Sequence, residues 1–199
     1  MAEIHLSETS LPVGGQELIS TRWWGMMCLI ATEGILFVYL IFAYAYLGSQ
    51  SPGTWPPTGP PPLNLSAPDT IILLASSLLL GWGVRRGGRS GSKARLQLAL
   101  AGTFVLGAIF LVVQGFEWAA KPFMLKTNAY SAIYFILTGF HMAHVVAGLL
   151  MLLVLLGWSV SGRLNHHPEC AFLGTLYWHF VDVVWLAVFT AIYLVPRFS

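Results

Sequence analysis

Charged residues are scarce in this chain. Asp, Glu, Lys and Arg together make up 9% of its 199 residues, while 56% are hydrophobic. A soluble globular domain carries about 25% charged residues. This composition excludes an ordinary soluble domain and leaves little polar chain for a water-exposed catalytic site. The formal net charge of +2 gives no reason to expect a nucleic-acid partner.

Cysteine is almost absent, with Cys28 and Cys170 as the only two. The apolar runs and charge distribution described next place both in the cytoplasmic half of a membrane protein, where a structural disulfide is not expected. Two cysteines alone are also too few for a metal site. We expect both to be small buried hydrophobic side chains. A secretory signal peptide is not expected either, because residues 1–22 are polar and the first apolar run is too long for one.

Long apolar runs are the dominant feature. Each of five runs reaches or approaches the roughly 17–25 residues that a membrane-spanning helix needs. The sequence therefore predicts an all-α, polytopic membrane protein, with a five-transmembrane-helix bundle forming a single domain over residues 23–199. The expected helices cover about 23–47, 68–84, 96–119, 130–158 and 171–195.

The distribution of positive charge predicts the orientation. Seven of the ten Lys and Arg residues fall on the side of the bundle that holds residues 1–22 and 85–95. Cytoplasmic loops carry the excess of Lys and Arg. We therefore expect a cytoplasmic N-terminal segment (1–22), an N-terminus inside and a C-terminus outside, in a bacterial plasma (inner) membrane.

Two connections have distinctive compositions. Residues 51–68 contain so much proline that neither helix nor central strand is expected. This outer loop is either a rigid hairpin connector or a docking surface for a partner subunit, with Trp55, Pro56 and Pro57 as the candidate docking residues. Residues 85–95 mix Arg with Gly and Ser, and they predict a flexible cytoplasmic turn that faces anionic lipid headgroups.

Glu33 is the acid nearest the middle of the first apolar run. No Lys or Arg occupies the membrane core of any expected helix, and Ile30, Gly34, Phe37 and Val38 surround Glu33 with little polarity. Desolvation is therefore expected to favour the protonated acid. Glu33 is either a neutral, hydrogen-bonded structural acid or a proton-handling or lipid-facing carboxyl.

Other ionisable residues lie at membrane depth, where burial is costly and function is the default hypothesis. His179 and Asp182 share one helical face at i,i+3 spacing and can partly satisfy each other. A metal site of imidazoles and carboxylates, or haem ligation by His144 and His179, is conceivable. Interhelical hydrogen bonds explain these groups more simply, so we expect no metal and a buried polar network of Glu117, His141, His144, His179 and Asp182.

Five motifs in order resemble subunit III of the haem–copper cytochrome oxidases, in its five-helix bacterial-type branch. They are Glu33 in an aromatic-rich first helix, Trp55-Pro56-Pro57, Gln114 with Glu117, Gly139-Phe140-His141 with His144-Val145 and Gly148, and the run from Trp178 to Trp185.

The resemblance implies a non-catalytic subunit with no catalytic residues and no bound cofactor of its own. Haem and copper are then expected in its partners, a catalytic subunit I and a copper-bearing or equivalent subunit II. Family members are thought to sustain turnover, to support proton uptake and to hold ordered phospholipids. The carboxyl that matches Glu33 reacts in the family with a hydrophobic carbodiimide.

The chain departs from the family pattern in two places. Longer members have two further helices before the Glu-bearing one, which form a lipid-filled cleft. Many members also carry a glutamate where this chain has Phe172, and the nearest acid here is Glu169.

Three functions remain open from the sequence. The first is a non-catalytic subunit of a proton-pumping terminal oxidase fed by cytochrome c or quinol, and hence part of an oxidoreductase complex. The second is a five-helix accessory subunit of a nitric oxide reductase. The third is an independent proton channel or carrier, although neither a pore-lining polar row nor paired repeats are visible.

Overall fold

The computed structural model describes residues 20–90, 93–166 and 168–198, and this part of the chain is helical with no strand. Five helices are long and apolar enough to cross a membrane, which confirms the predicted all-α, five-helix fold class. They are α1 (Thr21–Gln50), α2 (Ser66–Ser90), α3 (Lys93–Ala119), α4 (Ala129–Val160) and α5 (Pro168–Phe189). The short segments η1 (Arg163–His166), η2 (Thr190–Leu194) and η3 (Val195–Arg197) follow α4 and α5.

Local sequence signals set both ends of α4. Asn128 and Ser131 form a capping box, in which the Ser131 backbone N–H donates to Asn128 Oδ1 (2.8 Å) and the Asn128 N–H donates to Ser131 Oγ (3.0 Å). Gly162 follows the helix with φ of 77°, a left-handed conformation in which glycine meets no Cβ penalty. The chain can therefore turn sharply there and enter α5 through η1.

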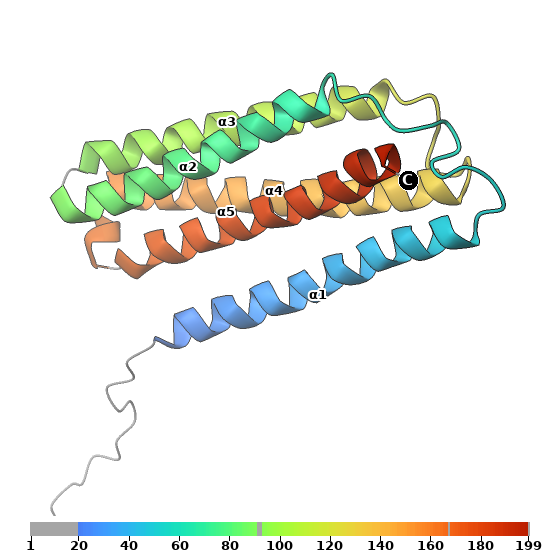
Figure 1. The fold of residues 1–199 in the computed structure, drawn as a ribbon. Coiled ribbons are helices and arrows are strands. Elements are labelled where there is room, and N and C mark those ends of the chain that lie inside the picture. The colour runs from blue at the N-terminus through green and yellow to red at the C-terminus, as the bar shows by residue number, and fades with distance from the viewer. Residues whose placement is uncertain (1–19, 91–92, 167, 199) are drawn as a thin grey trace, which may run out of the picture.

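Four of the helices form the body of the bundle. α2 packs against α3 and α5, and α4 packs against α3 and α5, so these four enclose the core (Figure 1). α1 packs mainly along α4 and α5, and Figure 1 shows it at the edge of the bundle. Phe37 and Tyr44 are its only buried residues, while Ile35, Val38 and Phe42 are more than 60% exposed.

The peripheral place of α1 overturns the expectation that both cysteines are buried. Cys28 is exposed and Cys170 is half-buried, and both are free thiols. A helix that packs on one side only leaves most of its circumference open, whatever its composition. The expectation failed because burial was inferred from hydrophobicity, and an apolar residue in a membrane helix can equally face lipid.

The connection between α2 and α3 also differs from expectation. α2 continues to Ser90 and α3 begins at Lys93, so most of residues 85–95 is helical and the predicted turn was drawn too long. Residues 91 and 92, which join the two helices, lie outside the described residues. No proline interrupts residues 85–95, so the helix can continue. The exposed Arg85 and Arg86 can place their charged groups in water beyond the apolar zone. The predicted N-terminal segment falls mostly on residues 1–19, which lie outside the described residues.

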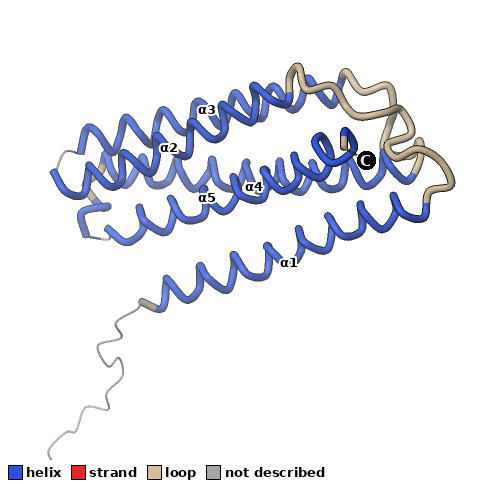
Figure 2. The backbone as a smooth tube through the Cα atoms, in the orientation of Figure 1, coloured by secondary structure: helices blue, strands red, loops and turns tan. Residues whose placement is uncertain are grey.

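The long connections gather at one end of the molecule, here called the proline-rich end. Figure 2 shows the loops of residues 51–65 and 120–128 together there, next to the C-terminal end of the chain. The Trp55 indole packs between Tyr44 and Tyr130, with ring centroids 5.5 and 5.2 Å away. Trp55 therefore ties the loop to the bundle, Pro56 is buried and Pro57 is exposed.

Two tryptophans of α5 centre the core. Trp178 and Trp185 are fully buried, and their indole N–H groups donate to Ser76 Oγ (3.0 Å) and Thr70 Oγ1 (2.9 Å) of α2. Gly107 of α3 and Gly148 of α4 make room for the Trp178 ring, because a Cβ at either position would lie 2.7 or 2.8 Å from it. Large rings against small residues allow these helices to approach closely.

Candidate functional site

The carboxyl of Glu33 on α1 meets the imidazole of His144 on α4. Glu33 Oε2 lies 3.1 Å from His144 Nε2, and the other ring nitrogen, Nδ1, lies 2.7 Å from the backbone carbonyl of Phe140. The Glu33 side chain is 34% exposed and that of His144 is 14% exposed. The Phe37 ring lies edge-on to the imidazole at 5.0 Å between centroids. The pair thus lies at the edge of the bundle, between its peripheral helix and its core.

The hydrogen bonds of His144 limit where its protons can be. A carbonyl oxygen only accepts, so His144 Nδ1 must carry a hydrogen and donate to Phe140. Nε2 then either accepts from a protonated Glu33 or, as part of an imidazolium, donates to a Glu33 carboxylate. Both arrangements place one hydrogen between the two side chains.

The sequence did not indicate His144 as the partner of Glu33, because only the apolar neighbours of Glu33 on its own helix could be identified. The missing information was the pairing of α1 with α4. Glu33 and His144 are 111 positions apart, and no periodicity in either helix indicates that they face each other.

His179 and Asp182 do not satisfy each other as the i,i+3 spacing suggested. His179 Nδ1 instead makes a hydrogen bond with the Ser77 hydroxyl of α2. The Asp182 carboxyl lies near the same serine, and neither of its oxygens has a hydrogen-bond partner within the described ranges. Both residues therefore face α2, and the serine of that helix lies between them.

His141 occupies a separate apolar environment. Its ring is fully buried and stacks on Trp185 at 4.8 Å between centroids, with the edge of Phe110 at 5.8 Å. Neither ring nitrogen has a hydrogen-bond partner among the described residues. His141 thus packs as an aromatic ring, one helical turn from His144 but in a different environment.

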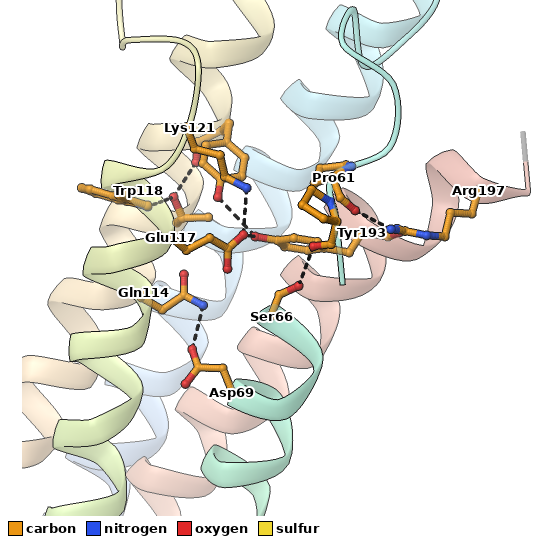
Figure 3. Close-up of polar contacts among 12 residues, drawn as sticks. Pro61, Ser66, Asp69, Gln114, Glu117, Trp118, Lys121, Tyr193 and Arg197 are labelled. Carbon is orange, nitrogen blue, oxygen red and sulfur yellow. Dashed lines mark hydrogen bonds and ion pairs between the residues drawn. The ribbon is translucent and has the colours of Figure 1, made fainter. Parts of the chain in front are cut away.

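Glu117 belongs to a cluster at the proline-rich end (Figure 3). Its Oε1 accepts from Lys121 Nζ at 2.8 Å and from the Tyr193 hydroxyl. The Tyr193 hydroxyl also contacts that of Tyr134 at 3.2 Å. The Glu117–Lys121 pair is almost completely buried, with side-chain exposures of 6% and 8%. Removing either partner of such a buried ion pair would strongly destabilise the protein, because the remaining charge would be left uncompensated.

The five residues proposed as one polar network therefore lie in separate surroundings. His144 pairs with Glu33, His179 and Asp182 face Ser77, His141 is enclosed by aromatic rings, and Glu117 pairs with Lys121. Over residues 20–90, 93–166 and 168–198, no three or more His, Cys, Asp or Glu side chains are grouped so that they could hold a metal ion.

Comparison with known proteins decides the family. The sequence model described as "Cytochrome c oxidase subunit III" matches residues 16–196. The chain belongs to the cytochrome c oxidase subunit III family. A relative from Synechocystis, named cytochrome c oxidase subunit 3, is 37% identical over 87% of this chain and 75% of its own length. The subunits of the same name from Lumbricus terrestris and Sus scrofa are 37% and 35% identical, over 85% of this chain and 68% of their own lengths.

Family membership agrees with the resemblance drawn from the motifs. With five helices of spanning length, this subunit III-family chain is a multi-pass membrane protein. The residues that carry the resemblance fall into two roles in the structure. Trp178, Trp185 and Gly148 build the core, whereas Glu33 and His144 form a polar pair at its edge.

Sequence reasoning missed Lys121 and Tyr193 of the Glu117 cluster. It also missed Asp69, whose Oδ2 accepts from Gln114 Nε2 at 2.9 Å beside the cluster (Figure 3). Asp69 follows Pro68 in the first turn of α2, where an acid is usually explained by the helix dipole. The i,i+4 spacing of Glu117 and Lys121 was a usable signal for an ion pair. Tyr193 could not have been found, because it reaches Glu117 from η2, 76 positions away.

Proposed function

We propose that this chain is the non-catalytic subunit III of a respiratory haem–copper terminal oxidase in a bacterial plasma membrane. The observation that carries this proposal is the family match over residues 16–196, together with relatives named as subunits of cytochrome c oxidase. In this assignment the chain binds no redox cofactor, and haem and copper belong to a catalytic subunit I and a copper-bearing or equivalent subunit II.

Within that complex, the Glu33–His144 pair is the candidate group for supporting proton uptake. The 3.1 Å contact between its two side chains and its partial exposure at the edge of the bundle suit proton exchange with a neighbouring subunit, lipid or water. The exposed apolar residues of α1 next to the pair suit contact with structural phospholipid or with a partner helix. Pro57 and its exposed neighbours in the 51–65 loop are the candidates for docking, because Trp55 and Pro56 are turned into the bundle.

The test is copurification of an affinity-tagged chain in mild detergent. We expect the catalytic haem–copper subunit and its partner to copurify, with haem in the complex and none in the isolated chain. A nitric oxide reductase as the principal partner would support the alternative accessory role. A chain that copurifies with no other subunit, and conducts protons when reconstituted alone, would contradict the proposal and favour a channel or carrier.

A further inference from the structure

The Gln114 amide lies between two buried acids at the proline-rich end. Gln114 and Glu117 project from the same face of α3, and Asp69 lies opposite in the first turn of α2. Gln114 Nε2 donates to Asp69 Oδ2 at 2.9 Å. Figure 3 shows the amide oxygen on the side of Glu117. All three residues are at most 4% exposed, so a poor arrangement of their polar atoms would be costly.

Three oxygens of this group have no hydrogen-bond partner among the described residues. They are Asp69 Oδ1, Gln114 Oε1 and Glu117 Oε2. An amide oxygen and an ionised carboxylate oxygen are both acceptors, so neither can satisfy the other. A buried acceptor without a donor costs about 1–3 kcal/mol, and more when it is charged. The group therefore lacks at least one hydrogen if both acids are ionised.

The charges of the group also indicate that one additional proton is bound. Asp69 and Glu117 together carry two negative charges when ionised, and Lys121 supplies one positive charge at Glu117. The other titratable groups facing the cluster are the phenols of Tyr130 and Tyr134 on α4 and of Tyr193 on η2. Arg197 of η3 directs its guanidinium to the backbone carbonyls of Pro61 and Tyr193. One bound proton would make the two acids and Lys121 neutral together.

We propose that Asp69, Gln114 and Glu117 form a binding site for one proton, shared between two carboxyls, with the amide of Gln114 oriented by the acid that holds it. When the proton is on Asp69, Oδ2–H donates to Gln114 Oε1, and Gln114 Nε2 donates to Glu117 Oε2. When the proton is on Glu117, Oε2–H donates to Gln114 Oε1, and Nε2 donates to Asp69 Oδ2. Each arrangement contains the same atoms and total charge, and a half rotation of the amide exchanges its donor and acceptor.

The structure holds the amide in the second orientation, with Nε2 donating to Asp69 Oδ2. The charges favour the first arrangement, with the proton on Asp69, which a half rotation of the amide produces. Glu117 then remains a carboxylate that accepts from Lys121, Tyr193 and Gln114. Asp69 Oδ1 becomes the carbonyl oxygen of a neutral acid, and an unpartnered neutral acceptor costs less than an unpartnered charged one. Moving the proton to Glu117 would deprive Lys121 of its counter-ion in a buried place.

Infrared spectroscopy of the full-length chain in lipid bilayers tests this site. At neutral pH we expect the wild-type chain to show a protonated-carboxyl band that shifts in D₂O. Asp69→Asn should remove the band by eliminating the acid. Glu117→Gln should remove the same band, because Asp69 then ionises to become the counter-ion of Lys121. Lys121→Met should increase the band, because both acids are then neutral.

Glu33→Gln and Asp182→Asn are the matched controls, since each alters another membrane-depth acid and should leave this band unchanged. Circular dichroism checks that every variant remains helical, and Asp69→Asn, which keeps the shape and a donor toward Gln114 Oε1, is the variant expected to fold best. A band that survives Asp69→Asn would overturn the site. If the band survives in Glu117→Gln, the proton belongs to Asp69 alone, and the proposal that the two carboxyls share it is wrong.

Discussion

At the scale of single residues, the acids at membrane depth differ in how the cost of their burial is met. Glu33 is paired with His144 and Glu117 with Lys121, whereas neither oxygen of Asp182 has a hydrogen-bond partner among the described residues. An isolated buried charge is far more costly than a paired or protonated one. The partner of Glu33 comes from another helix, whereas the partner of Glu117 follows it by four positions in the chain.

Glu33→Gln tests whether the Glu33–His144 pair acts through a titratable proton or only through its hydrogen bond. The amide keeps the shape of the acid and can still donate to His144 Nε2, but it does not titrate. We expect the initial oxygen-reduction rate of the assembled complex to stay within about twofold of wild type, which corresponds to about 0.4 kcal/mol of activation free energy. The number of turnovers before inactivation should fall. An oxygen electrode measures both.

Glu169→Gln is the control for this experiment, because Glu169 forms an ion pair with Arg22 at an exposed site away from His144. Its inactivation should resemble that of wild type. If Glu33→Gln abolishes the initial rate in a fully assembled complex, Glu33 has a direct part in turnover and the supporting role is wrong.

The hydrogen bond between Trp185 and Thr70 offers a test of interhelical polar contacts. Trp185→Phe and Thr70→Val each remove one partner of the 2.9 Å bond between α5 and α2. Interhelical hydrogen bonds in membranes average about 0.6 kcal/mol and reach about 1.7 kcal/mol. We expect a coupling free energy in this range from a double-mutant cycle, measured by denaturant unfolding in detergent micelles. Additive single effects would mean that the bond contributes nothing to stability.

At the scale of helices, close approach around Trp178 holds α3, α4 and α5 together. Gly148→Ala should destabilise the bundle by about 1–3 kcal/mol, because its Cβ would lie 2.8 Å from the fully buried indole. Gly157→Ala on the same helix is the control, since nothing lies within 4 Å of its added Cβ. That change should be neutral or slightly stabilising, because alanine favours helix.

Thermal unfolding of both variants in one detergent makes this comparison. Equal loss of stability in Gly148→Ala and Gly157→Ala would mean that backbone effects, and not the packing of Trp178, dominate. A stable Gly148→Ala would show that the indole can move aside.

At the scale of the whole molecule, the orientation in the membrane remains a prediction from charge. We expect the start of α3 in the cytoplasm and the 51–65 loop outside. In a chain with Cys28 and Cys170 replaced by serine, Lys93→Cys and Thr54→Cys place single thiols at exposed positions of opposite ends. An impermeant thiol reagent applied to intact cells should label only Thr54→Cys. Labelling of Lys93→Cys alone would reverse the topology.

The sequence by itself determined the fold class, because spanning a bilayer requires long apolar helices and few charges, and both can be counted along the chain. It also identified the family, since motifs such as the run from Trp178 to Trp185 are contiguous. Individual residues of the site were identifiable as well, because an acid or histidine at membrane depth is conspicuous wherever it lies.

Only the tertiary structure decided what those residues face. In a membrane, apolar side chains suit lipid and protein alike, so composition could not say that Cys28 is exposed or that α1 is peripheral. Nor could spacing show that Glu33 meets His144, or that Gln114 separates Asp69 from Glu117. These pairings join different helices, and they depend on helix neighbours and rotations that are set by packing around Trp178 and Trp185, not by the pattern within any single helix.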